Sequence, residues 1–153
     1  ARITIIAGGK PPTVWEIDKK RVSGASGYEV MHPDNDTRKD YSCVYDASGR
    51  SDLLDDWIGH CAVGAEIVLA GFYADRINFA FPQAFMKEIK LRISAEWKQA
   101  DMRAVNSMVD EGHLSLDELI TNRAHAENAA WAYRKAFEDE SCSKMVLDWG
   151  NLQ

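Results

Sequence analysis

The sequence predicts an α/β protein built on a parallel β-sheet with helices on both faces. Two strand–helix–strand passages lie within the first 75 residues, and this alternation is typical of that class. The segment 66–71 is apolar at nearly every position after its first, as expected of a strand buried on both faces. The third observation is a short apolar strand, 13–15, that ends at the carboxylate of Glu16.

The composition is that of an ordinary globular protein. Of its 153 residues, 46% are hydrophobic and 27% are charged, so the chain can form one core, or one domain and a fragment of another. Its net charge of −6 argues against a nucleic-acid surface, which usually has a basic bias. Three widely separated cysteines without a C-x-x-C pair argue against a structural zinc site and fit reduced thiols in the cytoplasm.

No part of the chain has the pattern of a membrane segment. The apolar runs are shorter than the ~18 residues that a membrane-spanning helix needs. The apolar segment 1–7 lacks the cleavage-site pattern of a signal peptide. We therefore expect a cytoplasmic protein without an integral membrane segment.

The first 36 residues contain short elements. The segment 2–7 has two interpretations: its β-branched residues favour a strand, whereas the Gly8-Gly9 pair after it suits the end of a helix. Beyond it the pattern predicts a strand, a short helix, a strand and a polar loop, at 13–15, 20–27, 28–31 and 32–36.

The middle of the chain contains the clearest amphipathic helix. A strand over 41–46 ends in the turn sequence 46–49, and Ser51 is expected to cap the helix that follows. A turn at 63–65 then leads into the buried strand 66–71. The apolar residues of the helix recur on one face: Leu53, Leu54, Trp57, Ile58 and Cys61.

The last part of the chain alternates between helices and strands. It begins with an aromatic stretch, 79–86, that contains Pro82. The predicted elements that follow are a strand, a helix, a second helix and a closing strand, at 90–95, 101–111, 127–137 and 144–147. Gly112 directly follows the helix 101–111, and a glycine just past a helix is a common signal of its C-terminus.

Glu16 is the strongest candidate for a binding residue. In nucleotide-binding β-α-β units, a carboxylate at the end of the second strand accepts hydrogen bonds from the adenosine ribose. A carboxylate there also repels a 2′-phosphate, which favours NAD over NADP. Asp18 is an alternative, and Arg21, five residues beyond Glu16, is a further candidate for a cofactor contact. Each of the three residues also has a simpler interpretation as a solvated surface charge.

The turn 46–49 is a second candidate. It follows a strand at the carboxyl edge of the predicted sheet, where dinucleotides lie in this class of fold. Asp46 and Ser48 are predicted to contact the cofactor, and Gly49 would let the backbone approach it. The alternative is an ordinary turn.

Motifs spread over the whole chain resemble one enzyme family. The tail segments 108–114, 119–123 and 129–133 resemble the C-terminal end of medium-chain dehydrogenases. The aromatic segments resemble the 3-hydroxyethyl bacteriochlorophyllide a dehydrogenases of that superfamily. The segments that carry this resemblance are 12–16, 27–30, 45–49, 67–73, 79–82, 95–97 and 144–149.

The resemblance implies a Rossmann-like sheet without its first strand and glycine-rich loop, plus C-terminal elements of a GroES-like catalytic domain. Those missing parts would precede Ala1, so we expect the chain to be the C-terminal half of a longer enzyme. Residues 1–112 would be a partial dinucleotide-binding domain, and residues 113–153 would return to the catalytic domain. The implied activity is NAD-dependent oxidation of the 3-(1-hydroxyethyl) group of bacteriochlorophyllide a to 3-acetyl, in bacteriochlorophyll a biosynthesis.

The resemblance also implies further NAD contacts. Gly71, Phe72 and Tyr73 would lie beside the nicotinamide half of the cofactor, and Tyr73 would also face the substrate macrocycle. Trp97 would stack on a flat ring, and Lys144 would approach the pyrophosphate. The sequence assigns no general base and no metal ligand, so we expect the isolated chain to be inactive.

Two alternatives remain at this point. The chain could be a non-catalytic binding or self-association module, in which an exposed sheet edge pairs two copies into a homodimer. It could also be a methyltransferase, since an acidic second-strand end also binds the ribose of S-adenosylmethionine. The tail pattern argues against the methyltransferase.

Overall fold

A computed structural model describes residues 1–18, 27–116, 119–139 and 141–150. The predicted helix 20–27 lies almost entirely outside these residues, as does Arg21. The chain divides into two compact units, Ala1–Asp36 with Gln99–Gln153, and Thr37–Lys98. The boundary expected at residue 112 stays a prediction.

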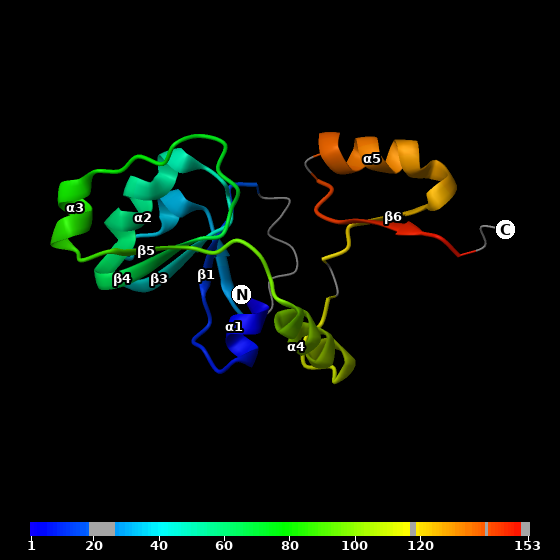
Figure 1. Cartoon of the computed structure of the whole chain (residues 1–153), viewed down its shortest axis with the longest axis horizontal. Helices are drawn as coiled ribbons and strands as arrows, with labels where there is room; N and C mark the ends of the chain where they lie inside the picture. The colour runs from blue at the N-terminus through cyan, green and yellow to red at the C-terminus, as the bar shows by residue number, and fades with distance from the viewer. Residues whose placement is uncertain (19–26, 117–118, 140, 151–153) are drawn as a thin grey trace. The chain divides into compact units, whose positions relative to one another are not determined.

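The unit 37–98 is built on a three-stranded sheet in the order β3-β4-β5. The strands are β3 (Tyr41–Asp46), β4 (Cys61–Leu69) and β5 (Lys90–Ile93). Both pairings are parallel, as predicted. The strands lie side by side in Figure 1, and helix α2 (Leu54–His60) lies against them. The buried hydrophobic residues of this unit are Leu54, Trp57, Ile58, Cys61, Ala65, Ile67, Val68, Leu69 and Ala84.

Strand β4 is longer than predicted, because the turn expected at 63–65 is a bulge. Gly64 has φ +77°, a conformation that glycine adopts without strain. Its N–H donates to the carbonyl of Lys87 at 2.7 Å. The register against β3 shifts between Tyr41 and Cys43, so the strand passes through the glycine and continues. Between the pairs Tyr41–Cys61 and Cys43–Glu66, β4 contains three more residues than β3, and the pairing continues beyond this irregularity.

Helix α2 begins and ends differently from the prediction. Ser51 does not cap it, since Ser51–Leu53 form a 3-10 turn (η3) and the N-cap has no side-chain hydrogen bond. At the other end, the Lys87 ammonium donates to the carbonyls of Ile58, Gly59 and Cys61 at 2.7–2.8 Å. The last carbonyls of a helix lack partners within the helix, so Lys87 acts as its C-terminal cap. Lys87 directly follows α3 (Phe81–Met86).

The other unit starts with a helix. Residues Arg2–Ile6 form α1, and Gly8 follows with φ +79°, so the helical interpretation of this segment is confirmed and the strand is wrong. Next come β1 (Thr13–Trp15) and β2 (Glu29–Met31), which pair in parallel. The predicted loop 32–36 contains a 3-10 turn, η2 (Pro33–Asn35).

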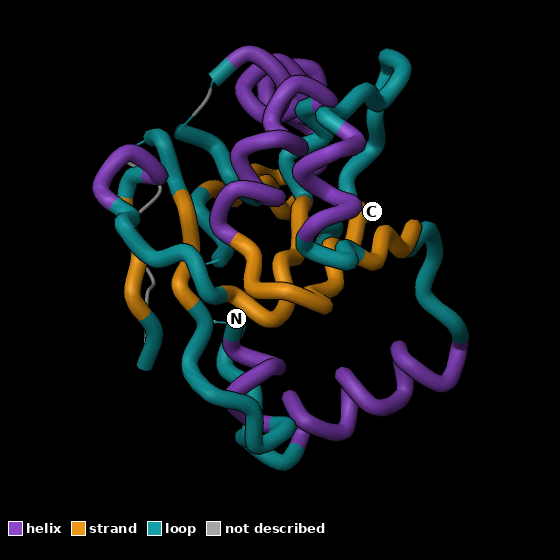
Figure 2. Tube along the Cα trace, turned by 90° about the vertical axis from the view of Figure 1, so that its left-hand side faces the viewer, coloured by secondary structure: helices purple, strands orange, loops and turns teal. Residues whose placement is uncertain are grey.

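The second half of this unit alternates between helix and strand, as Figure 2 shows by colour. Helix α4 (Gln99–Asp110) has no buried residue, and Gly112 follows it with φ +73°. Strands β6 (Asn122–His125) and β7 (Met145–Asp148) pair in parallel. Between them lie η4 (Ala126–Asn128) and α5 (Ala129–Glu138).

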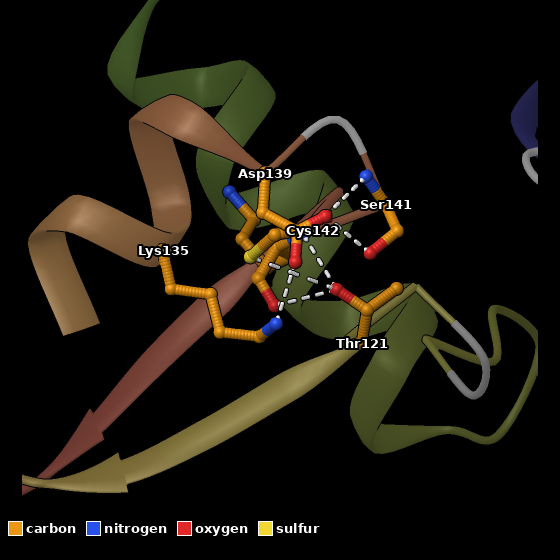
Figure 3. A network of polar contacts seen from close by, with 6 residues as sticks. Thr121, Lys135, Asp139, Ser141 and Cys142 are labelled. Carbon is orange, nitrogen blue, oxygen red and sulfur yellow. Dashed lines mark hydrogen bonds and ion pairs between the residues drawn. The ribbon is translucent and has the colours of Figure 1, made fainter. Parts of the chain in front are cut away.

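A polar network holds the turn between α5 and β7 (Figure 3). One carboxylate oxygen of Asp139 accepts a hydrogen bond from the Lys135 ammonium at 2.6 Å. The other oxygen accepts hydrogen bonds from the Ser141 N–H at 2.9 Å and the Ser141 hydroxyl at 2.5 Å. These donors hold the pKa of Asp139 well below its usual range, with the Lys135 hydrogen bond as the largest cause. Thr121 joins β6 to the same turn, since its Oγ accepts the Lys144 N–H at 3.2 Å.

Among the described helices, none is long and apolar enough to cross a membrane.

Candidate functional site

The loops after β3 and β4 begin side by side. Asp46 pairs with Leu69 in the sheet register, so both strands end at the same edge. The Asp46 carbonyl accepts the N–H groups of Ala70 at 2.8 Å and Gly71 at 3.0 Å. The backbone of one loop is thereby bound to the end of the other strand.

The Asp46 side chain joins the two loops a second time. It is only 5% exposed, and a carboxylate buried to this extent needs hydrogen-bond donors. Its Oδ1 accepts the Ser48 N–H at 3.0 Å, and its Oδ2 accepts the Tyr73 hydroxyl. Burial, followed by the hydrogen bond to Asp46, raises the pKa of Tyr73 far above its usual value. Tyr73 is therefore a neutral donor at physiological pH.

Two glycines allow a close backbone contact at the same place. Gly49 has φ +70°, and a Cβ there would lie 2.4 Å from the carbonyl oxygen of Phe72. A Cβ on Gly71 would lie 2.5 Å from the Gly49 nitrogen. Larger residues would force the loops apart. The close approach at Gly49 is thus one between the two loops, and the approach to the cofactor predicted there stays a prediction.

The remaining predicted residues of this unit are exposed. Phe72 projects from the β4 loop with 92% of its surface exposed. The Ser48 hydroxyl oxygen accepts the Arg50 N–H at 3.1 Å, which leaves its own proton for another acceptor. Trp97 lies four residues past the end of β5 and is 66% exposed.

Glu16 stands at the corresponding end of β1 in the other unit. Its N–H donates to the Met31 carbonyl at 3.0 Å and extends the ladder beyond the strand. Its Oε1 accepts the Asp18 N–H at 2.9 Å, which fixes the carboxylate at the strand end. Within the described residues this is the one hydrogen bond to the Glu16 carboxylate. No described residue donates a hydrogen bond to its second oxygen.

Sequence reasoning missed a buried carboxylate that binds Trp15, the residue before Glu16. The Trp15 indole N–H donates to Asp36 at 2.7 Å, and Asp36 is only 8% exposed. Asp36 is the last residue of the predicted polar loop 32–36. The two residues are 21 positions apart, and no local pattern relates them.

The structure therefore brings six of the predicted residues together within the unit 37–98. The cluster consists of Asp46, Ser48, Gly49, Gly71, Phe72 and Tyr73. Glu16 and Lys144 belong to the other compact unit, and Lys144 is exposed at the start of β7. Within the described part of the chain, no group of three or more His, Cys, Asp or Glu is placed to hold a metal ion.

The fold is that of the alcohol dehydrogenases. The chain superposes on L-idonate 5-dehydrogenase from Escherichia coli K-12 with a TM-score of 0.82 and 19% identity, over 95% of this chain and 45% of the other. An alcohol dehydrogenase from Escherichia coli CFT073 complexed with NADH gives a TM-score of 0.80 and 17% identity, over 97% and 48%. No protein-family model matches the chain.

Sequence comparison narrows this class. The chain is 54% identical over 149 residues to 2-desacetyl-2-hydroxyethyl bacteriochlorophyllide A dehydrogenase of Rhodobacter capsulatus, and 52% identical to the Cereibacter sphaeroides enzyme of the same name. D-xylulose reductase A of Aspergillus oryzae is 27% identical over 118 residues. The resemblance inferred from the motifs is confirmed: over 97% of its length this chain is a homologue of the hydroxyethyl bacteriochlorophyllide dehydrogenases. It spans about half the length of these curated relatives, 48% and 47%.

Proposed function

We propose that the chain is the main part of the NAD-binding region of a dehydrogenase that oxidises the 3-(1-hydroxyethyl) group of bacteriochlorophyllide a to a 3-acetyl group. The observation that carries this proposal is the 54% identity to a dehydrogenase named for that substrate. The alcohol dehydrogenase fold supports it. Activity would also require the part of the enzyme to which this chain has no counterpart.

Glu16 would select and hold the adenosine end of NAD. One carboxylate oxygen is fixed by the Asp18 N–H at 2.9 Å, and the other would accept a ribose hydroxyl. The negative charge would repel the 2′-phosphate of NADP. Arg21 is proposed to lie near the adenosine and Lys144 near the pyrophosphate.

The loops after β3 and β4 would support the nicotinamide end. The Ser48 hydroxyl proton is available to a cofactor oxygen, and Gly71 and Phe72 supply backbone groups at the carboxyl edge. Trp97 would cover a flat ring. Each residue is proposed for binding and orientation, and the exposed apolar side chain of Phe72 would help to exclude water.

Oxidation of the alcohol needs a hydride acceptor and a proton acceptor. Bound NAD would supply the first, at C4 of the nicotinamide. Tyr73 does not suit the second role, because its own proton is held by Asp46 and its pKa is raised. A base near neutral pH is what this step requires, so we assign the base outside this chain.

The proposal is tested by calorimetric titration of the chain with NAD. Glu16→Ala should weaken NAD binding about 10- to 100-fold, because hydrogen bonds to a charged group contribute about 1.5–3 kcal/mol. It should also reduce the preference for NAD over NADP. Glu29→Ala is the matched control, since Glu29 starts β2 at the opposite end of the same sheet. Equal NAD affinities for the wild type and Glu16→Ala would contradict the proposal.

A second candidate is a self-association module. Among the described strands, β1 pairs only with β2, and β3 pairs only with β4. Each therefore has one edge that could accept a strand from a second copy. Sedimentation at several concentrations would support this candidate if the mass doubled while NAD produced no heat. A monomer that binds NAD would exclude it.

A further inference from the structure

We propose that Asp46 and Tyr73 are a positioning pair, a clasp that holds the loops after β3 and β4 together as one preformed ledge for the cofactor. In this role Asp46 does not touch the cofactor; it acts through Tyr73 and Ser48. The inference rests on the proposed function for its ligand, but the clasp itself is a property of the unit 37–98 alone.

Every acceptor of the Asp46 residue is turned toward protein donors. Its carbonyl oxygen accepts hydrogen bonds from the N–H groups of Ala70 and Gly71. One carboxylate oxygen accepts the N–H of Ser48, and the other accepts the hydroxyl of Tyr73. The side chain is 5% exposed, so little of it is accessible to a ligand. These bonds run from one residue at the end of β3 to both loops.

The contact between the loops leaves no room for adjustment. Gly49 and Gly71 meet backbone to backbone, and a single added methyl group on either would lie within 2.5 Å of the other loop. Backbone packing this close is stable only if something holds the loops in register. The Tyr73 hydrogen bond ties the β4 loop to Asp46 at the end of β3 a second time, three residues past Ala70.

The charge state of the pair suits a permanent clasp. A neutral phenol that donates to a carboxylate forms a charge-assisted hydrogen bond, which is stronger than a neutral one. The pKa of Tyr73 is raised by burial first and by Asp46 second, so the phenol keeps its proton throughout the neutral range. Phe72, between the two anchor points Gly71 and Tyr73, is left 92% exposed.

The first test is the exchange of backbone amides in the loops, with no ligand present. In Tyr73→Phe and in Asp46→Asn, the amides of Ser48 and Gly71 should exchange about 10- to 100-fold faster, as expected for loss of a hydrogen bond to a charged group. The amide of Val68, inside β4, should not change. Tyr45→Phe is the matched control, because Tyr45 precedes Asp46 on the same strand but is 69% exposed. Unchanged loop exchange in Tyr73→Phe would overturn the clasp.

The second test is NAD affinity in a double-mutant cycle. If the pair acts as a unit, Tyr73→Phe and Asp46→Asn should each weaken binding by a similar factor, and the double variant should be no weaker than either alone. Additive effects would show that each residue touches the ligand separately and would overturn the positioning role. If the wild-type chain does not bind NAD, the proposed function fails, whereas the loop-exchange test still decides the clasp.

Discussion

The side chain of Trp15 holds the end of strand β1 by a hydrogen bond to a buried carboxylate. Its indole N–H donates to Asp36 at 2.7 Å, and Asp36 is 8% exposed. The bond joins the end of β1 to the loop that follows β2, directly before Glu16. A buried carboxylate that loses a donor keeps its desolvation cost, so this pair should contribute to stability as well as to the position of the strand end.

We therefore expect Trp15→Phe to lower the free energy of unfolding by about 1–3 kcal/mol, because the buried Asp36 carboxylate loses one hydrogen bond, that from the indole N–H. Urea unfolding followed by circular dichroism measures this change. Trp149→Phe is the control, since Trp149 is 68% exposed and its replacement should change the free energy by less than about 0.5 kcal/mol. Equal effects of the two substitutions would contradict a role for the indole N–H.

At the scale of elements, helix α5 ends on a residue of unfavourable charge. Asp139 is its C-cap, and the negative end of the helix dipole disfavours a carboxylate there. Lys135, one turn earlier, and Ser141, just beyond, compensate with hydrogen bonds of 2.5–2.9 Å (Figure 3). Together they lower the pKa of Asp139.

This network predicts a specific pH dependence. Because the folded pKa of Asp139 lies below the unfolded value of about 3.9, its stabilisation is present above that unfolded value and is lost as pH falls through the folded pKa. The difference in unfolding free energy between the wild type and Asp139→Asn should therefore shrink as the pH is lowered from about 5. Chemical unfolding at several pH values measures it.

Glu138→Gln provides the control for this measurement. Glu138 is exposed on the same helix and has no hydrogen-bond partner among the described residues. Its replacement should leave the pH dependence unchanged. A constant difference between the wild type and Asp139→Asn across the acid range would contradict the assignment of the network.

At the scale of the whole molecule, the three described sheets differ in how they are supported. In the three-stranded sheet, β4 is hydrogen-bonded on both sides, and Ile67 and Val68 are fully buried within it. The β1-β2 pair has one ladder and no fully buried residue. Two-stranded pairs are marginal without further packing.

Amide hydrogen exchange on the wild-type chain should follow this difference. The amides of β4 should exchange at least about tenfold more slowly than those of β1 and β2, because local opening is easiest where burial and pairing are least. Mass spectrometry or NMR of the exchanged chain provides the rates. Slower exchange in β1 and β2 than in β4 would contradict the expectation that the buried residues of β4 form the most stable part of the chain.

Sequence patterns were sufficient where the deciding contacts are local. The strands 13–15 and 41–46, the parallel arrangement, and the glycine just past α4 were all predicted correctly. In a strand, apolar residues alternate with polar ones or follow one another over a few positions. The left-handed turn after a helix favours glycine, and this preference depends only on the adjacent residues. Glu16 could be singled out for the same reason, because the end of a strand is a local feature.

Sequence patterns alone were enough for the class of fold, its parallel strands, the ends of β1 and β3, and a resemblance that comparison confirmed. Only the tertiary structure decided that Gly64 is a bulge, that Lys87 caps α2, and that Asp46 and Asp36 are buried on Tyr73 and Trp15. The last three depend on partners 21 to 29 residues away. From sequence alone, a carboxylate is expected to be a solvated surface charge. Burial requires a hydrogen-bond donor that the fold brings close, and no local sequence pattern identifies that donor.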